Sequence, residues 1–130
     1  MSEANTCRKL AIIMSMAIPE RAEDSVMPLV YAAVAAAMDC EVEVHFIGRA
    51  VRLLVEGVAA GLDAGEGDGR TVHDYLQEAA QYGARFLACS KALKQHVGAD
   101  EAKIAEFSGA AGAATVVMRS LDPEWRILSF

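Results

Sequence analysis

The chain has 130 residues, 54% of them hydrophobic and only 6% aromatic, which predicts one domain with a single core. Its formal charge of −6 argues against nucleic acid or an anionic membrane surface as the main partner, because both attract clustered Lys and Arg. The residues before Leu10 are polar, and the apolar run that follows is too short for a secretory signal or a membrane span. We therefore expect a cytoplasmic protein with a polar tail over residues 1–8 and a single domain over 9–130.

The first half of the chain alternates predicted strands and helices. Residues 10–14 form a short continuous apolar run, which predicts a strand buried on both faces in the centre of the sheet. Apolar residues then recur with a helical period over 26–38, where Ser25 is a candidate N-cap and Pro28 fits the first turn. Residues 41–47 alternate polar and apolar, which predicts a second strand nearer a sheet edge, with one wetter face.

The helical period returns over 51–60, and the glycine-rich and acidic segment 61–70 predicts a surface loop without a phosphate-binding motif. Thr71 and Asp74 have the spacing of a capping box, so we expect a helix from there to Tyr82. A strand over 85–88 would then deliver Cys89 to a helix over 90–97. After these we expect a short strand over 104–107, an alanine-rich helix over 109–121 and a last strand over 125–130.

This alternation predicts an α/β fold with a parallel sheet, whose ligands gather beyond the carboxyl ends of the strands. Cys89 would lie at such an end, where the amides of the next helix favour the thiolate. Ser90 and Lys91 begin that helix and are candidates to support the site. In a parallel sheet, Ser15 and Met16 at the end of the first strand are further candidates to lie beside Cys89.

The other cysteines and the histidines carry weaker signals. The three cysteines are an odd number at irregular spacing, which predicts reduced thiols rather than a disulfide framework. Cys7 falls in the polar tail, and Cys40 lies between two acidic residues that oppose a thiolate, so both are expected to be unreactive. No Cys or His residues have short metal-ligand spacing, so no metal is expected. His73 would reach Cys89 as a base only if the loop before it folded over the site.

One segment gives a family resemblance. Residues 86–93, Phe-Leu-Ala-Cys-Ser-Lys-Ala-Leu, with Gly98 after them, resemble the cysteine segment of the DsrE/DsrF-like family, which includes TusD-type sulfur carriers. Residues 9–16, 71–76, 112–117 and 127–130 fall in the order of that family. The resemblance thus extends from about residue 9 to the end of the sequence.

The resemblance implies a three-layer flavodoxin-like sandwich with a mostly parallel sheet of about five strands, assembled as homotrimers or homohexamers. It also implies that Cys89 accepts sulfane sulfur from a donor protein as a persulfide and yields it to an acceptor protein, without metal or cofactor. Such a chain would be a sulfurtransferase or a persulfide carrier. The alternative is a non-catalytic oligomeric assembly, or a small-ligand-binding module of the same fold, in which Cys89 is structural.

Overall fold

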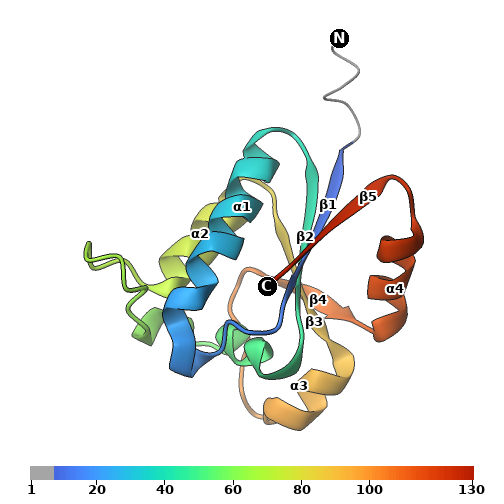
Figure 1. Ribbon diagram of the computed structural model, residues 1–130. Coiled ribbons are helices and arrows are strands. Elements are labelled where there is room, and N and C mark those ends of the chain that lie inside the picture. Colours follow the sequence, from blue (N-terminus) through green and yellow to red (C-terminus); the bar gives the residue numbers. More distant parts are fainter. Residues whose placement is uncertain (1–7) are drawn as a thin grey trace.

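The computed structural model describes residues 8–130, so the interpretation of the tail and of Cys7 falls outside the described residues. Five parallel strands form one sheet in the order β4-β3-β2-β1-β5 (Figure 1). The strands are β1 (Lys9–Met14), β2 (Glu41–Phe46), β3 (Arg85–Cys89), β4 (Phe107–Ala111) and β5 (Trp125–Ser129). The α-helices are α1 (Val26–Ala37), α2 (Val72–Gln81), α3 (Ser90–His96) and α4 (Ala113–Leu121), and the 3₁₀ segments are η2 (Pro19–Ser25), η3 (Gly48–Leu54) and η4 (Ala59–Gly61).

The strand order determines which helix covers which face of the sheet. Strands β1 to β4 are added in one direction, so right-handed crossovers place their connecting helices on the same face. The chain then returns past β1 to form β5, which places α4 on the opposite face. Figure 1 shows α1 and α2 on one side of the sheet and α4 on the other. The result is the three-layer, flavodoxin-like sandwich that the family resemblance implies.

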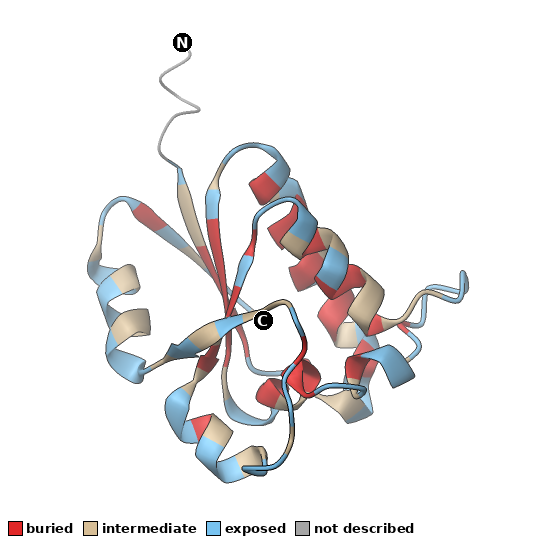
Figure 2. Cartoon of the chain, turned by 180° about the vertical axis from the view of Figure 1, so that it is seen from behind, coloured by how far each residue is buried: buried red, intermediate tan, exposed pale blue. Residues whose placement is uncertain are grey.

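The two faces are lined by alternate residues of the strands. Ile12, Val44 and Phe86 are paired across β1, β2 and β3 and point into the main core with α1 to α3, on what we call the core face. Phe46 and Phe86 pack edge to face there, with ring centroids 5.7 Å apart. The intervening residues, such as Ile13 of β1, form the second face, which we call the α4 face. Helix α4, which the structure describes in full, has no buried residue (Figure 2).

The helix starts agree with the sequence in one case and differ in the other. The Thr71 hydroxyl accepts from the amide of Asp74 at 3.2 Å, and the Asp74 carboxylate accepts from the amide of Thr71 at 2.9 Å. The predicted capping box of α2 is therefore confirmed. Ser25 does precede α1, but its side chain makes no cap bond. Its hydroxyl instead donates to the carbonyl of Ala22 at 2.6 Å, within the preceding η2 turn.

The predicted helix over 51–60 is wrong. The chain forms η3 there, leaves helical geometry at Val55 and resumes only in η4. Val55 makes an antiparallel bridge to Lys103, and Gly57 has a φ of +87°, so neither residue can continue a helix. The glycine-rich segment 61–70 projects beside α2 as a loop, as the sequence predicts (Figure 1). Within it, Asp63 forms an antiparallel bridge with Thr71, the residue that follows the segment.

The fourth strand lies a few residues later in the chain than the sequence predicts. Residues 107–111 form β4, whereas the sequence predicts a strand over 104–107 and a helix from 109. The small residues of the segment Phe-Ser-Gly-Ala-Ala have little intrinsic strand preference, and tertiary pairing with β3 overrides it. The helix α4 begins only at Ala113, after Gly112 in extended geometry.

The sequence predicts β1 at the centre of the sheet and β2 nearer an edge, and the structure shows the reverse. β2 has two strands on one side and two on the other, while β1 lies between β2 and β5. The expected wetter face of β2 is buried: Glu43 and His45 each have 1% of their surface exposed. The alternation of polar and apolar residues therefore does not mark an edge strand here. Within residues 8–130, no helix combines the length and the apolar character needed to cross a membrane.

Candidate functional site

An apolar cavity lies at the carboxyl edge of the sheet, on the α4 face, and the half-buried Cys89 forms part of its wall. Its volume is about 290 Å³. The described residues that line it come from β2, β3, β4 and α4, and are His45, Ile47, Cys89, Ala111, Gly112, Ala113, Val116 and Val117. The sequence therefore places Cys89 correctly at a strand end, and the structure adds a cavity of a size that admits a small molecule or a short peptide side chain.

Small residues beside Cys89 leave room for this cavity. Cys89 is paired with Ala111 on the edge strand β4, and Gly112 and Ala113 continue the chain into α4. A register shift lies between Phe86 and Leu87, where the Ser108 hydroxyl accepts from the Phe86 amide at 3.1 Å. Bulges of this kind re-aim side chains, and they are frequent beside functional sites. Longer side chains at 111 to 113 would fill the space in front of the sulfur.

Two helices begin at this edge. Cys89 is the N-cap residue of α3, although its side chain makes no cap bond, and Gly112 is the N-cap residue of α4, which likewise has no side-chain cap. The first amides of a helix have no partner within that helix and carry a partial positive charge. Because Gly112 and Ala113 line the cavity, the amide end of α4 lies at its wall, an arrangement that favours an anion there.

Next to the cavity, a buried carboxylate connects three elements. Glu43 accepts two hydrogen bonds from Arg119 of α4, both at 2.9 Å, and one from Arg85 of β3 at 2.6 Å. The Nε2 of His45 lies 2.9 Å from Oε1, the carboxylate oxygen that also accepts from Nε of Arg119. Burial raises the pKa of Glu43, but the hydrogen bonds from Arg119 and His45 outweigh it and hold that pKa below its ordinary value. Glu43 is therefore ionised at neutral pH.

This cluster, in which Glu43 and His45 are buried while Arg85 and Arg119 are partly exposed, was not found from the sequence. The guanidinium of Arg119 also lies 4.5 Å from the ring centre of Trp125, which fixes α4 to β5. A signal was available: strands of a parallel sheet are usually buried on both faces, so charged residues in the middle of one need buried partners. The partner itself, 76 residues away, is set only by the topology.

The other predicted site residues lie apart from the cavity. Ser90 and Lys91 are exposed on the first turn of α3 and are absent from the described wall of the Cys89 cavity. Ser15 and Met16 follow β1, which β2 separates from β3. Ser15 donates to the carbonyl of Phe130 at 3.2 Å, and Met16 lines a different depression with Phe130. The structure thus does not place these four residues in the described wall of the Cys89 cavity, and their role in a site stays a prediction.

Comparison with known proteins identifies the family. Residues 8–130 match the DsrE/DsrF-like family. The chain belongs to this family. This family is associated with sulfur relay.

Solved structures support the family fold. The YchN protein of E. coli is similar with a TM-score of 0.74 at 14% identity, covering 95% of this chain and 99% of that one. The protein MTH1491 of Methanobacterium thermoautotrophicum, of unknown function, has a TM-score of 0.61 at 18% identity, with 95% and 99% covered. The protein BT1422 of Bacteroides thetaiotaomicron, also of unknown function, has a TM-score of 0.60 at 18% identity, with 100% and 98% covered. No curated protein matches the chain.

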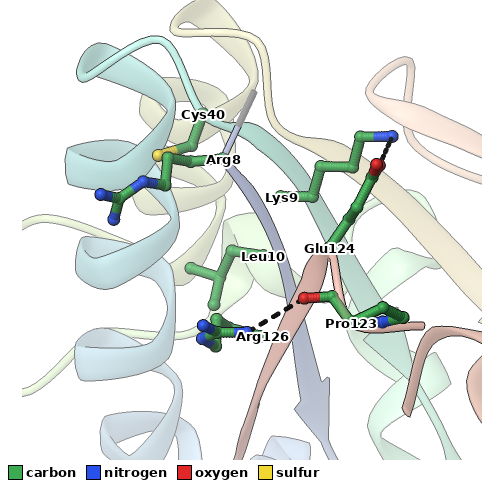
Figure 3. A pocket seen from close by; sticks show the side chains of 7 residues that line it. All are labelled: Arg8, Lys9, Leu10, Cys40, Pro123, Glu124 and Arg126. Carbon is green, nitrogen blue, oxygen red and sulfur yellow. Dashed lines mark hydrogen bonds and ion pairs between the residues drawn. The ribbon is translucent and has the colours of Figure 1, made fainter. Parts of the chain in front are cut away.

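Cys40 is the second cysteine that the structure describes, and its surroundings can be compared with those of Cys89. Cys40 lies at the opposite, amino edge of the sheet, in the wall of a cavity of about 480 Å³ (Figure 3). Its sulfur lies beside Arg8, and the facing side of this cavity carries Lys9, whose ammonium pairs with Glu124 at 3.1 Å. This cavity is polar and charged, whereas that of Cys89 is apolar. The two thiols therefore have opposite surroundings.

Among residues 8–130, no three His, Cys, Asp or Glu side chains gather as a metal site would require. The histidines at 73 and 96 lie outside the described wall of the Cys89 cavity. His73 is paired through Nε2 with Glu106 at 3.0 Å on the other side of the molecule's sheet. The carbonyl of His96 accepts from Arg52 at 3.1 Å. His45 is thus the histidine that shares a cavity with the thiol.

Proposed function

We propose that the protein accepts sulfane sulfur on Cys89 as a persulfide and passes it to an acceptor thiol, as a sulfurtransferase or persulfide carrier. One observation carries this proposal: the Cys89 thiol ends β3 in the wall of a cavity that also holds the amide end of α4. Such a position gives a thiolate both stabilisation and access to a second reactant. The sulfur-relay association of the family supports it further.

The chemistry needs only thiol groups. The Cys89 thiolate attacks the outer sulfur of a donor persulfide, R–S–SH, so that a new S–S bond forms on Cys89 while the donor S–S bond breaks. The donor leaves as a thiolate and takes up a proton. In the second half-reaction an acceptor thiolate attacks the outer sulfur of the Cys89 persulfide and regenerates the Cys89 thiolate. We propose that donor and acceptor are cysteine residues of other proteins.

Mass spectrometry after incubation with a sulfane-sulfur donor tests this function. The parent protein should gain one sulfur atom per chain in a form that a reducing agent removes. The variant Cys89→Ser should not gain it, and Cys40→Ser is the matched control, since it removes a thiol from the opposite edge of the sheet. Loading of Cys89→Ser at the same rate as the parent would overturn the proposal.

A second candidate function is the binding of a small apolar ligand, because the cavity wall is almost wholly apolar. Cavities with such walls bind small apolar ligands. In this alternative the chain is a non-catalytic assembly or ligand-binding module, and Cys89 is a structural part of the wall. Alkylation of the native protein distinguishes the two: a Cys89 that reacts no faster than in a sealed core favours the module, and rapid modification favours sulfur transfer.

We also infer that the protein forms homotrimers or homohexamers, because two separate apolar surfaces face outward. The first, the α4 surface, includes Met118 and Leu121, which are 62% and 78% exposed, and also Val117. The second, the α1 surface, follows one side of α1 and its C-terminal cap, with Met27, Tyr31, Val34 and Met38. A ring needs one repeated contact between copies, and pairing of two rings needs another, so two surfaces suit a hexamer.

Analytical ultracentrifugation tests the assembly. Leu121→Asp should disrupt contacts through the α4 surface, and Tyr31→Asp those through the α1 surface, so that the two variants give different smaller species. Arg126→Asp, at an exposed position outside both surfaces, is the control. Sedimentation of the parent only as a 13.8 kDa monomer would remove this inference.

A further inference from the structure

His45 is a buried histidine whose protonation pattern is set by its neighbour. Its Nε2 lies 2.9 Å from Glu43 Oε1, and both side chains are about 1% exposed. The carboxylate is ionised, because Arg119 holds it through two hydrogen bonds. An ionised carboxylate can only accept hydrogen bonds, so Nε2 of His45 carries the proton. In the neutral ring this leaves the lone pair on Nδ1.

The orientation of the ring leaves that lone pair directed away from Glu43. Glu43, His45 and Ile47 follow one another along the same face of β2 and its continuation, and Ile47 lines the cavity. The two ring nitrogens lie on opposite edges of an imidazole. Because the Nε2 edge turns toward Glu43, the Nδ1 edge is turned away from that carboxylate. His45 lines this cavity together with Cys89.

Among the described residues, the cavity wall offers the thiol one side chain that titrates, that of His45. Of the described residues in its wall, all but His45 and Cys89 are glycine, alanine, valine or isoleucine. Across the sheet, His45 is paired with Ile13 on β1 and Leu87 on β3, both uncharged. A proton that leaves Cys89 inside the cavity therefore has His45 as its acceptor.

The charged groups around the histidine are few and fixed. Glu43 is the direct partner of the ring, and it is held by Arg119 from α4 and Arg85 from β3. Strand β1 contributes no charge at this level, since its neighbours of Glu43 and His45 are Ala11 and Ile13. The negative charge of Glu43 stabilises a proton gained by the ring, as a buried carboxylate does for a catalytic histidine.

We propose that His45 is the general base and acid of the site: it takes the proton of the Cys89 thiol and returns it to the departing thiolate. This inference rests on the proposed function only in that Cys89 is the nucleophile. The Cys89 S–H proton moves to Nδ1 of His45, and the thiolate attacks the outer sulfur of a donor persulfide. The donor S–S bond breaks, and the donor thiolate takes the proton from the imidazolium. Glu43 is a positioning residue that orients the ring and fixes its tautomer.

The pH dependence of Cys89 alkylation tests the proton transfer without any sulfur donor. In His45→Gln, the midpoint pH of alkylation should rise, and the rate of persulfide loading at neutral pH should fall by roughly 10²-fold, the range of general-base catalysis. Glu43→Gln should move the midpoint in the same direction. His73→Gln is the matched control, because His73 also pairs with a glutamate but lies outside the described wall of this cavity. Identical profiles for His45→Gln and His73→Gln would overturn the inference.

Nitrogen NMR of the native histidines gives a second readout, which stays informative if His45→Gln fails to fold. We expect the neutral His45 ring to be protonated at Nε2, and the chemical shift of its Nδ1 to change when Cys89 is replaced by Ser. Protonation at Nδ1, or an Nδ1 signal unchanged by Cys89→Ser, would refute the role of His45. The two proposals can fail separately. If the parent gains sulfur on Cys89 but the alkylation pH profile of His45→Gln is unchanged, only the role of His45 as a base is wrong. If that profile shifts but the parent gains no sulfur, only the sulfur transfer is wrong.

Discussion

The two faces of the sheet are built on different principles. On the core face, rows of apolar side chains such as Ile12, Val44 and Phe86 close against three helices. On the α4 face, a single helix covers a buried carboxylate, a histidine and a thiol at the edge of a cavity. The same strands serve both, since alternate residues point to opposite sides. Stability and chemistry are thereby separated within one sheet, one residue apart along each strand.

The largest expected effect comes from truncating the core face. Leu76 of α2 is fully buried, so Leu76→Ala should lower the free energy of unfolding by about 2–5 kcal/mol. Leu87 is only half-buried, on the α4 face of β3, and Leu87→Ala should cost roughly 1 kcal/mol. Urea unfolding of both variants measures the difference. Equal losses would mean that the core face and the α4 face contribute equally to the free energy of unfolding, contrary to our expectation.

Removing one cation from the α4 face should give the next largest effect. Arg119→Met keeps an apolar stem against Trp125 but takes two hydrogen bonds from the buried Glu43. We expect a loss of roughly 2 kcal/mol, because Arg85 still holds the carboxylate. Arg126→Met, at an exposed site, should change the unfolding free energy by less than about 0.5 kcal/mol. If both variants unfold at the same urea concentration, the hydrogen bonds from Arg119 to Glu43 do not contribute to the free energy of unfolding.

A smaller effect is expected in the pH dependence of the free energy of unfolding, to which Glu43 on the α4 face contributes. The folded pKa of Glu43 lies below its usual 4.5, so its contribution is present above that value and is lost as the pH falls through the lower folded pKa. One such carboxyl steepens the acid slope by at most about 1.4 kcal/mol per pH unit. Glu43→Gln should therefore flatten the slope below pH 4.5, while Glu101 and Glu106, whose pKa values are also lowered, contribute equally to both proteins. Parallel curves for parent and variant would contradict this.

The smallest effect concerns the helix that closes the core face. Thr71→Ala removes the N-cap of α2 and should cost about 1 kcal/mol. Because Thr71 and Asp74 bond each other reciprocally, the double variant Thr71→Ala/Asp74→Ala should lose less than the sum of the two single losses. Thermal unfolding of the three variants checks this. Simple additivity would show that the two caps act independently.

Local patterns predict the parts of this molecule that local forces determine. The apolar run of β1, the period of α1 and the capping box at Thr71 act over a few residues, and each predicts its element. The same holds for Cys89, because a short apolar strand followed by a helix places it at the carboxyl edge.

What the sequence leaves open depends on distant pairing. The strand β4 is a run of small residues that pairs with β3, and nothing within it distinguishes it from the start of an alanine-rich helix. Glu43 and His45 look like the solvated side of an edge strand until Arg119 is packed over them. The family resemblance indicates the fold and the thiol, whereas the histidine beside the thiol emerges only from the arrangement of four elements around one cavity.

The lone helix of the α4 face also has a kinetic consequence. A nine-residue helix without a buried residue belongs to the part of a fold that opens locally long before the whole chain unfolds. When α4 lifts, Arg119 leaves Glu43 and the wall formed by Val116 and Val117 leaves Cys89. A cysteine of another protein then meets less steric hindrance at Cys89. Deuterium uptake by the amides of α4 would therefore report the fraction of molecules in which the thiol is open to a macromolecule.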